Sequence, residues 1–576
     1  MNIVGKTVVS VISVLLVVGV ALAVVVVVHH QGNGKKVGVA APSSSKSMVE
    51  SVCSNTDYKE ACEQTLKPLS HNLTADYKDF IKAAVQATVD QVTKSLNLSE
   101  SLLVEASKNS SSRLKMSLED CNDLLSLAIS QLQASFSMVG DSNVHTIQDR
   151  SAELKSWLSS VISYAETCVD GVEEPKFQAS LTKIYGQLKD ALQNATALTD
   201  NALAIVSAIS EILSAFGLKF NPNAIHGRRL LGETAIGKDG LPTWFSVSDR
   251  KLMALQTKGR VTPNAVVAKD GSGQFKTIGA ALAAYPNNHV GRYIIYVKAG
   301  VYNEYITVEK NMVNIFMYGD GPRRTIVTGR KSYTGGFSTF RTASFSVIGA
   351  GFVCKGMGFQ NTAGPEGHQA VALRVQSEMS AFFNCRMDGY QDTLYVQAGR
   401  QFYRNCVISG TIDFIFGDGS VVIQNSRLIV RRPMDNQLNA VTAQGRKERH
   451  QPTGIVIHNC RIVPEMKLFP DRFKIPTYLG RPWKEFSRTV IMESTLADFI
   501  QPSGWFPWAG NFALDTLYYA EYANRGPGAR TNQRVHWRGY HVIGRNEAQQ
   551  FTVAKFLDGQ RWLPATGAPF LPNFKW

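Results

Sequence analysis

Apolar residues recur at helical spacing in the first third of the chain, between about residue 48 and residue 216. In each of three stretches they lie three or four residues apart, the spacing that places them on one face of an amphipathic helix. The stretches are Ile81–Leu96, Leu118–Leu132 and Leu154–Cys168. Helices with one apolar face must pack against each other, so the pattern predicts an antiparallel helical bundle over residues 48–216.

The pattern changes from about Val261 to the C-terminus. Short runs of β-branched and aromatic residues alternate there with Gly, Asn and Asp, which predicts short strands joined by tight turns. Predicted strands include Tyr293–Val297, Asn314–Tyr318, Val421–Gln424 and Ile455–His458. A second, all-β domain over residues 261–576 therefore follows the helical one.

Asparagines recur at a nearly constant interval within this second domain. Asn384, Asn405 and Asn425 are 21 and 20 residues apart, and Asn459 follows after 34. A period near 20 with a short strand per period predicts a parallel β-helix, one repeat per coil. We interpret these asparagines as a structural ladder. The longer last interval predicts a polar loop inserted at about residues 431–454.

Four further polar residues share this period. Gln391 lies 22 residues after Gln369, and Asp413 lies 21 residues after Asp392. Equivalent positions in consecutive coils lie about 4.8 Å apart, so the two carboxylates are expected to be stacked neighbours. Carboxylates that close cannot ionise independently, and one becomes a proton donor while the other is a charged nucleophile or base.

The N-terminus carries a predicted export signal, and the inter-domain segment carries a predicted processing site. Residues 7–28 lack charge and are long enough to span a bilayer, so a signal-anchor and a long signal peptide both fit, with a polar stem to residue 47. Residues 217–260 form a linker in which the dibasic pair Arg228-Arg229 is a predicted processing site for a subtilisin-like protease. Glycosylation triplets agree with a secretory route; they begin at Asn72, Asn97, Asn109 and Asn194.

The distribution of charge narrows the choice of binding partner. From residue 232 onward there are 41 Lys and Arg against 24 Asp and Glu, a net charge of +17, whereas residues 1–231 carry −2. A basic domain without a nucleic-acid-binding signature favours an acidic polysaccharide over nucleic acid.

The cysteines of the first domain indicate disulfides. In an oxidising compartment the natural disulfide pairs are Cys53–Cys62 and Cys121–Cys168, one of three possible connectivities. No metal or cofactor is indicated.

The cysteine layout and helical pattern resemble the pectin methylesterase inhibitor domain, a four-helix bundle with a short N-terminal hairpin. The β domain carries five motifs, in order, that resemble the plant pectin methylesterases and imply a right-handed parallel β-helix. The first domain then matches the pro-region found in one group of these enzymes. The motifs are Gly300–Glu304, Gln369–Leu373, Tyr390–Leu394, Asp413–Gly417 and Leu479–Trp483.

This resemblance implies hydrolysis of the methyl esters of homogalacturonan. It makes Asp413 the nucleophile that forms an acyl-enzyme, and Asp392 the general acid that protonates methoxide and then activates water. Gln391 and Gln369 would donate hydrogen bonds to the oxyanion. Arg481 is expected to hold Asp413 ionised, because a guanidinium favours the charged carboxylate.

Other residues are assigned by the same resemblance. Trp483 and Thr339 are expected to contact the sugar, and Phe416 and Trp505 are further candidates for the groove lining. Glu304 is interpreted as a structural partner. Ser426 stands where the family commonly has a cysteine bonded to the equivalent of Cys406, so that bridge cannot form; Cys385 is a candidate substitute. Cys354 and Cys460 are expected to be free and buried.

The leading hypothesis is a pectin methylesterase exported to the cell wall as a pro-protein, with an autoinhibitory bundle that processing removes. A separate inhibitor protein and, before any cleavage, the membrane are further expected partners. Two alternatives stay open: another β-helix pectin-degrading enzyme, either a polygalacturonase or a pectate lyase, and a non-catalytic wall-binding or inhibitor protein.

Overall fold

The computed structural model describes residues 45–208, with gaps at 73–74, 110–111, 142–146, 148–149 and 173–178, and residues 262–575, with a gap at 288. These residues belong to one compact unit, 45–576. The predicted apolar segment 7–28, linker 217–260 and processing pair Arg228-Arg229 lie outside the described residues. No described helix is both long enough and apolar enough to cross a membrane.

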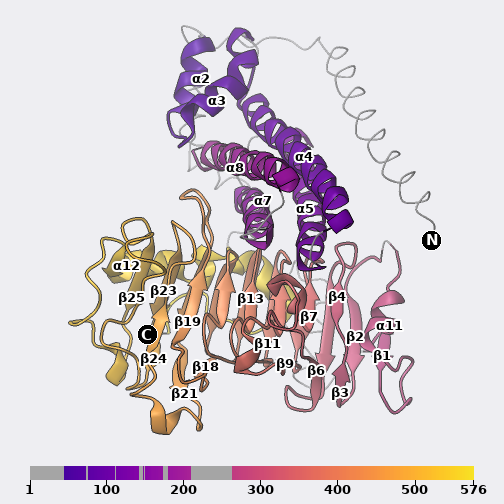
Figure 1. The fold of residues 1–576 in the computed structure, drawn as a ribbon, viewed down its shortest axis with the longest axis vertical. Helices are drawn as coiled ribbons and strands as arrows, with labels where there is room; N and C mark the ends of the chain where they lie inside the picture. The colour runs from indigo at the N-terminus through magenta and orange to yellow at the C-terminus, as the bar shows by residue number, and fades with distance from the viewer. Residues whose placement is uncertain are drawn as a thin grey trace, which may run out of the picture. The chain divides into compact units, whose positions relative to one another are not determined.

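Four long helices form the predicted bundle, and each predicted apolar stripe is part of its core (Figure 1). The hairpin precedes them. The helices are α2 Ser45–Cys53, α3 Lys59–Leu66, η1 Lys67–His71, α4 Tyr77–Asn109, α5 Ser112–Asp141, α7 Ser151–Val172 and α8 Ala179–Ser207. The predicted disulfides are confirmed: Cys53–Cys62 closes the hairpin and Cys121–Cys168 joins α5 to α7.

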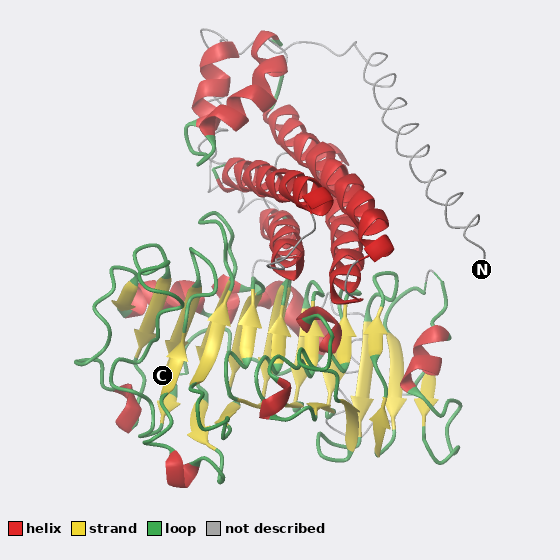
Figure 2. Ribbon diagram, viewed as in Figure 1, coloured by secondary structure: helices red, strands yellow, loops and turns green. Residues whose placement is uncertain are grey.

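The second domain is a parallel β-helix, as predicted, in which strands stack into three all-parallel sheets (Figure 2). Sheet B has eleven strands: β1 Ala265–Val267, β2 Tyr293–Val297, β5 Ile315–Gly319, β8 Val353–Lys355, β11 Ser380–Phe383, β14 Arg400–Arg404, β17 Ser420–Gln424, β20 Gly454–His458, β23 Arg488–Met492, β25 Tyr518–Tyr522 and β26 Tyr540–Val542.

The other two sheets complete each coil. Sheet C has eight strands: β3 Gly300–Asn303, β6 Thr325–Gly329, β9 Gly358–Asn361, β12 Arg386–Asp388, β15 Val407–Gly410, β18 Arg427–Val430, β21 Arg461–Pro464 and β24 Thr495–Leu496. Sheet D has seven: β4 Ile306–Val308, β7 Phe345–Val347, β10 Leu373–Val375, β13 Leu394–Val396, β16 Ile415–Gly417, β19 Asn439–Gln444 and β22 Thr477–Gly480.

The prediction of a structureless insertion at 431–454 is wrong. The segment contains β19, a buried strand of sheet D that pairs with β16 and β22. The repeat is long because the turns on both sides of β19 are long, at residues 431–438 and 445–453. The coil is therefore complete, and its two long turns replace the single predicted loop.

The interior of the β-helix is a set of apolar columns held in register from coil to coil. In sheet B, Phe382 pairs with Tyr403, Tyr403 with Ile423 and Ile423 with Ile457, and all four are fully buried. The outer face of sheet B is covered as well, by C-terminal helices that pack on Phe402 and its neighbours. Both faces are buried, which explains the continuous apolar runs in these strands.

Short helices complete the second domain. Two backbone N–H groups at the start of α11 donate to the Glu304 carboxylate, at 3.0 Å each, which confirms the structural role predicted for that residue. The elements are α11 Ile278–Ala283, η3 Thr339–Thr342, η4 Pro365–Gly367, η5 Phe469–Asp471, η6 Pro527–Ala529, α12 Arg545–Ala548, η7 Gln549–Phe551, α13 Val553–Phe556, α14 Gly559–Trp562 and η8 Leu563–Thr566.

The asparagine ladder is present at three of its four positions. Asn425 donates to Asn405 (2.5 Å) and Asn459 donates to Asn425 (3.1 Å). All have positive φ values of 51–52°, a conformation that Asn tolerates better than most residues. Asn384 has the same backbone conformation.

The four cysteines of the second domain are free and buried. This confirms the prediction for Cys354 and Cys460, and Cys385 does not form a substitute bridge with Cys406. Cys385 Sγ instead lies 3.7 Å from Cys354 Sγ.

Candidate active site

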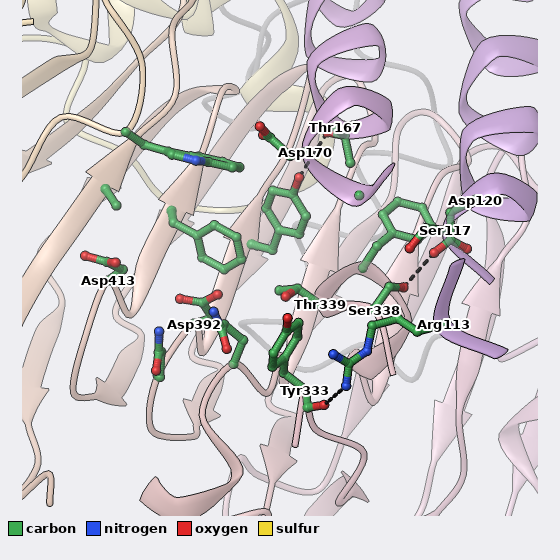
Figure 3. A pocket seen from close by; sticks show the side chains of 18 of the residues that line it. Arg113, Ser117, Asp120, Thr167, Asp170, Tyr333, Ser338, Thr339, Asp392 and Asp413 are labelled. Atoms are coloured by element: carbon green, nitrogen blue, oxygen red, sulfur yellow. Dashed lines mark hydrogen bonds between the residues drawn. The ribbon is translucent and has the colours of Figure 1, made fainter. Parts of the chain in front are cut away.

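Asp392 and Asp413 occupy equivalent turns of consecutive coils, just before β13 and β16. Leu394 pairs with Ile415 in register, and the Asp392 N–H donates to the Ile412 carbonyl at 3.1 Å. Both aspartates have positive φ, 64° and 50°, which turns their side chains out of the strand direction. The predicted stacking of the two carboxylates is therefore confirmed, and Figure 3 shows both at one cavity.

Arg481 reaches Asp413 from two coils further along. It follows β22, and its guanidinium forms a bidentate ion pair in which Nε is 2.9 Å from Oδ1 and Nη2 is 2.7 Å from Oδ2. Gly480 fixes the approach of this backbone, because a Cβ there would lie 2.1 Å from Thr442 Oγ1. Among the described residues, Asp392 forms no ion pair, so the two aspartates differ in their partners.

Burial acts on both carboxylates in the same direction. It raises the pKa of Asp392 well above its ordinary value, and the neighbouring charge of Asp413 raises it further. Burial also raises the pKa of Asp413, but hydrogen bonds and charge from Arg481 oppose that rise. The environment thus favours the protonated form of Asp392 and, comparatively, the ionised form of Asp413.

The cavity, of about 370 Å³, brings together all seven residues predicted to be functional. Gln391 directly precedes Asp392, and Gln369 lies in the corresponding turn one coil earlier. The amide oxygen of Gln391 has no hydrogen-bond partner among the described residues. The predicted residues are Thr339, Gln369, Gln391, Asp392, Asp413, Arg481 and Trp483.

Aromatic side chains form one wall. The rings of Trp483 and Phe416 lie 5.9 Å apart between centroids, and both line the cavity. Trp505, the other aromatic candidate, is instead a core residue that is 1% exposed and packs on Tyr519, so its predicted place in the groove is wrong. Its indole N–H donates to buried Glu521 at 3.3 Å.

Sequence reasoning missed Trp508. Its ring lies 4.4 Å from the guanidinium carbon of Arg481, and it lines the cavity while remaining 37% exposed. An exposed tryptophan close in sequence to a turn is a weak signal by itself. Only its contact with Arg481 identifies it.

Sequence reasoning also missed that the helical bundle lines this cavity. Six bundle residues do so, from the first half of α5 and the end of α7 (Figure 3). Asp120 accepts a hydrogen bond from Ser338 Oγ at 2.6 Å, and Thr167 Oγ1 lies 3.2 Å from Tyr395 Oη. The six residues are Arg113, Ser117, Asp120, Thr167, Asp170 and Gly171.

Charged pairs join the same helices to the rim. Lys484, which follows Trp483, donates to Glu166 at 3.0 Å and to Asp170 at 2.7 Å. Arg341 pairs with Asp120 and, at 3.0 Å, with Glu119. The cavity is therefore lined both by the aspartates, glutamines and Arg481 of the β-helix and by residues of the bundle.

Comparison with known proteins gives two family matches. Residues 264–560 match Pectinesterase, and residues 47–205 match Plant invertase/pectin methylesterase inhibitor. Among similar proteins of Arabidopsis thaliana, probable pectinesterase/pectinesterase inhibitor 21 is 41% identical over 98% of this chain and 82% of that protein. Pectinesterase 4 is 40% identical over 98% of this chain and 99% of that protein.

The solved structure of the pectin methylesterase from carrot is similar to the second domain. It is 52% identical, covers 55% of this chain and 100% of its own, and gives a TM-score of 0.54. The similarity confirms the right-handed parallel β-helix predicted for this part of the chain.

Proposed function

We propose a catalytic mechanism for this chain, which belongs to the pectinesterase family and is a carboxylic ester hydrolase acting on the methyl esters of pectin. The observation that carries the mechanism is the bidentate Arg481–Asp413 pair beside Asp392, whose carboxylate forms no ion pair among the described residues. The two carboxylates are chemically alike, and their surroundings assign them different tasks.

Asp413 is the nucleophile. Its carboxylate attacks the ester carbonyl carbon to give a tetrahedral intermediate, which collapses to an acyl-enzyme as the bond to the methoxy oxygen breaks. Asp392 donates its proton to that oxygen, and methanol leaves. Asp392, now ionised, takes a proton from water. The resulting hydroxide attacks the acyl carbon, frees Asp413 as its carboxylate and leaves a galacturonic acid group, which releases its proton to water.

Gln391 and Gln369 stabilise the oxyanion. Both amide side chains line the cavity beside the two aspartates, and an amide N–H₂ is a hydrogen-bond donor. Loss of one such donor typically costs about 3 kcal/mol of transition-state stabilisation. Trp483 provides a flat apolar face for a sugar ring, and Thr339 provides a polar contact in the same cavity.

The helical bundle keeps this site closed in the precursor. Support comes from bundle residues Thr167 and Asp170, which line the same cavity as Asp392 and Asp413. Export to the cell wall through the segment 7–28, cleavage by a subtilisin-like protease at Arg228-Arg229 and removal of the bundle would open the cavity. A separate inhibitor protein could then occupy the position that the bundle vacates.

The other readings of the sequence find no support. The family matches name neither a polygalacturonase nor a pectate lyase. A purely binding or inhibitory role does not account for an intact, buried carboxylate pair with an arginine partner.

The Asp413→Ala variant tests the mechanism. Asp413 lines the cavity and is not part of the apolar core, so the fold should persist, as far-ultraviolet circular dichroism would show. We expect methanol release from esterified pectin to fall to background with no change in polymer length. Methanol release at the wild-type rate would disprove the role of Asp413.

Processing is tested separately with an Arg228→Ala, Arg229→Ala double variant. We expect this chain to be exported uncleaved, or retained, and to release less methanol than the wild-type export product. Equal cleavage, export and activity would contradict control by this dibasic site.

A further inference from the structure

A second groove runs along the corner between sheets B and C, away from the catalytic cavity. Its volume is about 430 Å³, and it is built from the turns β14–β15, β17–β18 and β20–β21 together with Arg525 and Lys575. We call it the arginine groove. Its polar lining comprises Asn405, Asn425, Ser426, Asn459, Arg427, Arg461, Arg525 and Lys575.

Three arginines of this groove occupy one column of the β-helix. Arg427 of β18 pairs in register with Arg461 of β21, and Arg461 pairs with Thr495, which in turn pairs with Arg525. Neighbouring strands lie about 4.8 Å apart, and residues in register point to the same face. All three arginines are exposed. The column therefore repeats positive charge along the axis of the domain.

Within the described residues, neither Arg427 nor Arg461 forms an ion pair, and no Asp or Glu lines the groove. Two nearby arginines are neutralised. Arg386, at the same register position two strands earlier, pairs with Asp388 at 2.5 Å, and Arg431, directly after β18, pairs with Glu465 at 3.3 Å. Like charges placed opposite each other destabilise a sheet. The adjacent Arg427 and Arg461 thus have a folding cost that the paired Arg386 and Arg431 avoid.

The floor of the groove adds to its preference for anions. In the asparagine ladder, Asn425 donates to Asn405, Asn459 donates to Asn425, and Arg525 donates to Asn459 at 3.3 Å. Each of the three amide oxygens already accepts a hydrogen bond. The groups that remain to face a ligand are mainly donors, which suits a carboxylate.

We propose that the arginine groove binds de-esterified, polyanionic stretches of pectin at a site separate from the catalytic cavity. Guanidinium groups bind carboxylates in bidentate geometry. A polygalacturonate chain presents a carboxylate on every sugar, and the column presents charge on two successive coils and, after Thr495, again at Arg525. The inference rests on the pectinesterase function, because the reaction product is the source of these carboxylates.

The described residues that line the arginine groove all belong to the second domain. Bundle residues line the catalytic cavity, but none of the described bundle residues lines the arginine groove. The full-length precursor therefore binds de-esterified wall polymer before its catalytic cavity opens, and the processed enzyme stays attached to the product it has made.

The test uses full-length chain and fully de-esterified polygalacturonate in native affinity electrophoresis at several salt concentrations. An Arg427→Gln, Arg461→Gln variant should bind about tenfold more weakly at low salt and show a shallower salt dependence. A Lys276→Gln, Arg538→Gln control removes the same charge from exposed positions outside both grooves and should change binding less than about twofold. Equal weakening in both variants would overturn the proposal.

Hydrogen exchange on the wild-type chain supplies a readout that needs no variant. Polygalacturonate should slow amide exchange in segments 405–407, 425–427 and 459–461, and the proposal fails if those segments are unaffected. The ligand carries no ester, so neither readout depends on catalysis. Methanol release, assayed in parallel, reports on the proposed mechanism independently.

Discussion

The most direct test of the closed precursor is to remove the charges by which the bundle contacts Lys484. Lys484 Nζ pairs with Glu166 and Asp170 of α7, at 3.0 and 2.7 Å. The side chains are 14%, 15% and 29% exposed, so all three are shielded from water to some extent. A Glu166→Gln, Asp170→Asn variant keeps the shapes and leaves the catalytic domain unaltered.

The magnitude follows from this burial. Hydrogen bonds to charged groups contribute about 1.5–3 kcal/mol each, and breaking a buried pair from one side costs about 3–5 kcal/mol because the remaining charge stays desolvated. Asp170 is the more exposed partner, so the lower limit applies. A loss of about 3 kcal/mol shifts the equilibrium between closed and open bundle by roughly 100-fold.

The assay is methanol release by uncleaved chain carrying Arg228→Ala and Arg229→Ala, so that processing cannot open the cavity. We expect the Glu166→Gln, Asp170→Asn changes to raise its activity by at least tenfold. A Glu153→Gln, Asp190→Asn control also removes two bundle carboxylates, one of them paired with Arg150 inside the bundle, and should leave activity unchanged. Unchanged activity in the test variant, with a bundle that still folds, would refute the reasoning.

Three further outcomes are expected. The processed enzyme should show a bell-shaped pH profile for methanol release, because Asp413 must be ionised and Asp392 protonated, and the two apparent pKa values belong to the pair; a profile with no alkaline limb would contradict the role of Asp392. Arg481→Lys loses the bidentate contact that opposes the rise in the pKa of Asp413. The kcat/KM of this variant should therefore fall about 10- to 100-fold, and the acidic limb of its pH profile should move to higher pH. An acidic limb at the wild-type pH would exclude this coupling between Arg481 and Asp413. Burial and the nearby Asp200 carboxylate raise the pKa of Glu448 from 4.5 to about 8. The folded protein therefore favours protonated Glu448, whereas the unfolded chain ionises it above about pH 4.5. Thermal stability should fall as the pH rises from about 4.5 to about 8. Glu448→Gln should flatten that fall in differential scanning calorimetry, and an identical pH dependence in both chains would argue against it.

Much of the fold could be predicted because its signals are periodic and local. Helical spacing identified the stripes of α4, α5 and α7, and the 20-residue repeat identified the coils. That repeat also placed Asp392 beside Asp413, since register is inherited from coil to coil. The prediction failed at β19, where long turns on both sides disguised a normal coil as one inserted loop.

Side chains that act across several coils were harder to place. Trp505 and Trp508 are three residues apart in similar surroundings, yet one is a core residue and the other stacks on Arg481. Nothing in the local pattern separates them, because burial depends on which face the turn presents after the chain has closed.

The sequence alone determined the two domains and the stacked aspartates, because each depends on spacing along the chain, and it favoured the two disulfides of the bundle. The roles of the residues around the aspartates came from the resemblance of the motifs. Only the tertiary structure showed that the expected contact between Arg481 and Asp413 is bidentate, that α5 and α7 line the same cavity, and that Arg427 and Arg461 are adjacent without an ion-pair partner among the described residues. These features join residues tens to hundreds of positions apart. Their distances depend on packing between coils and helices, which no local period encodes.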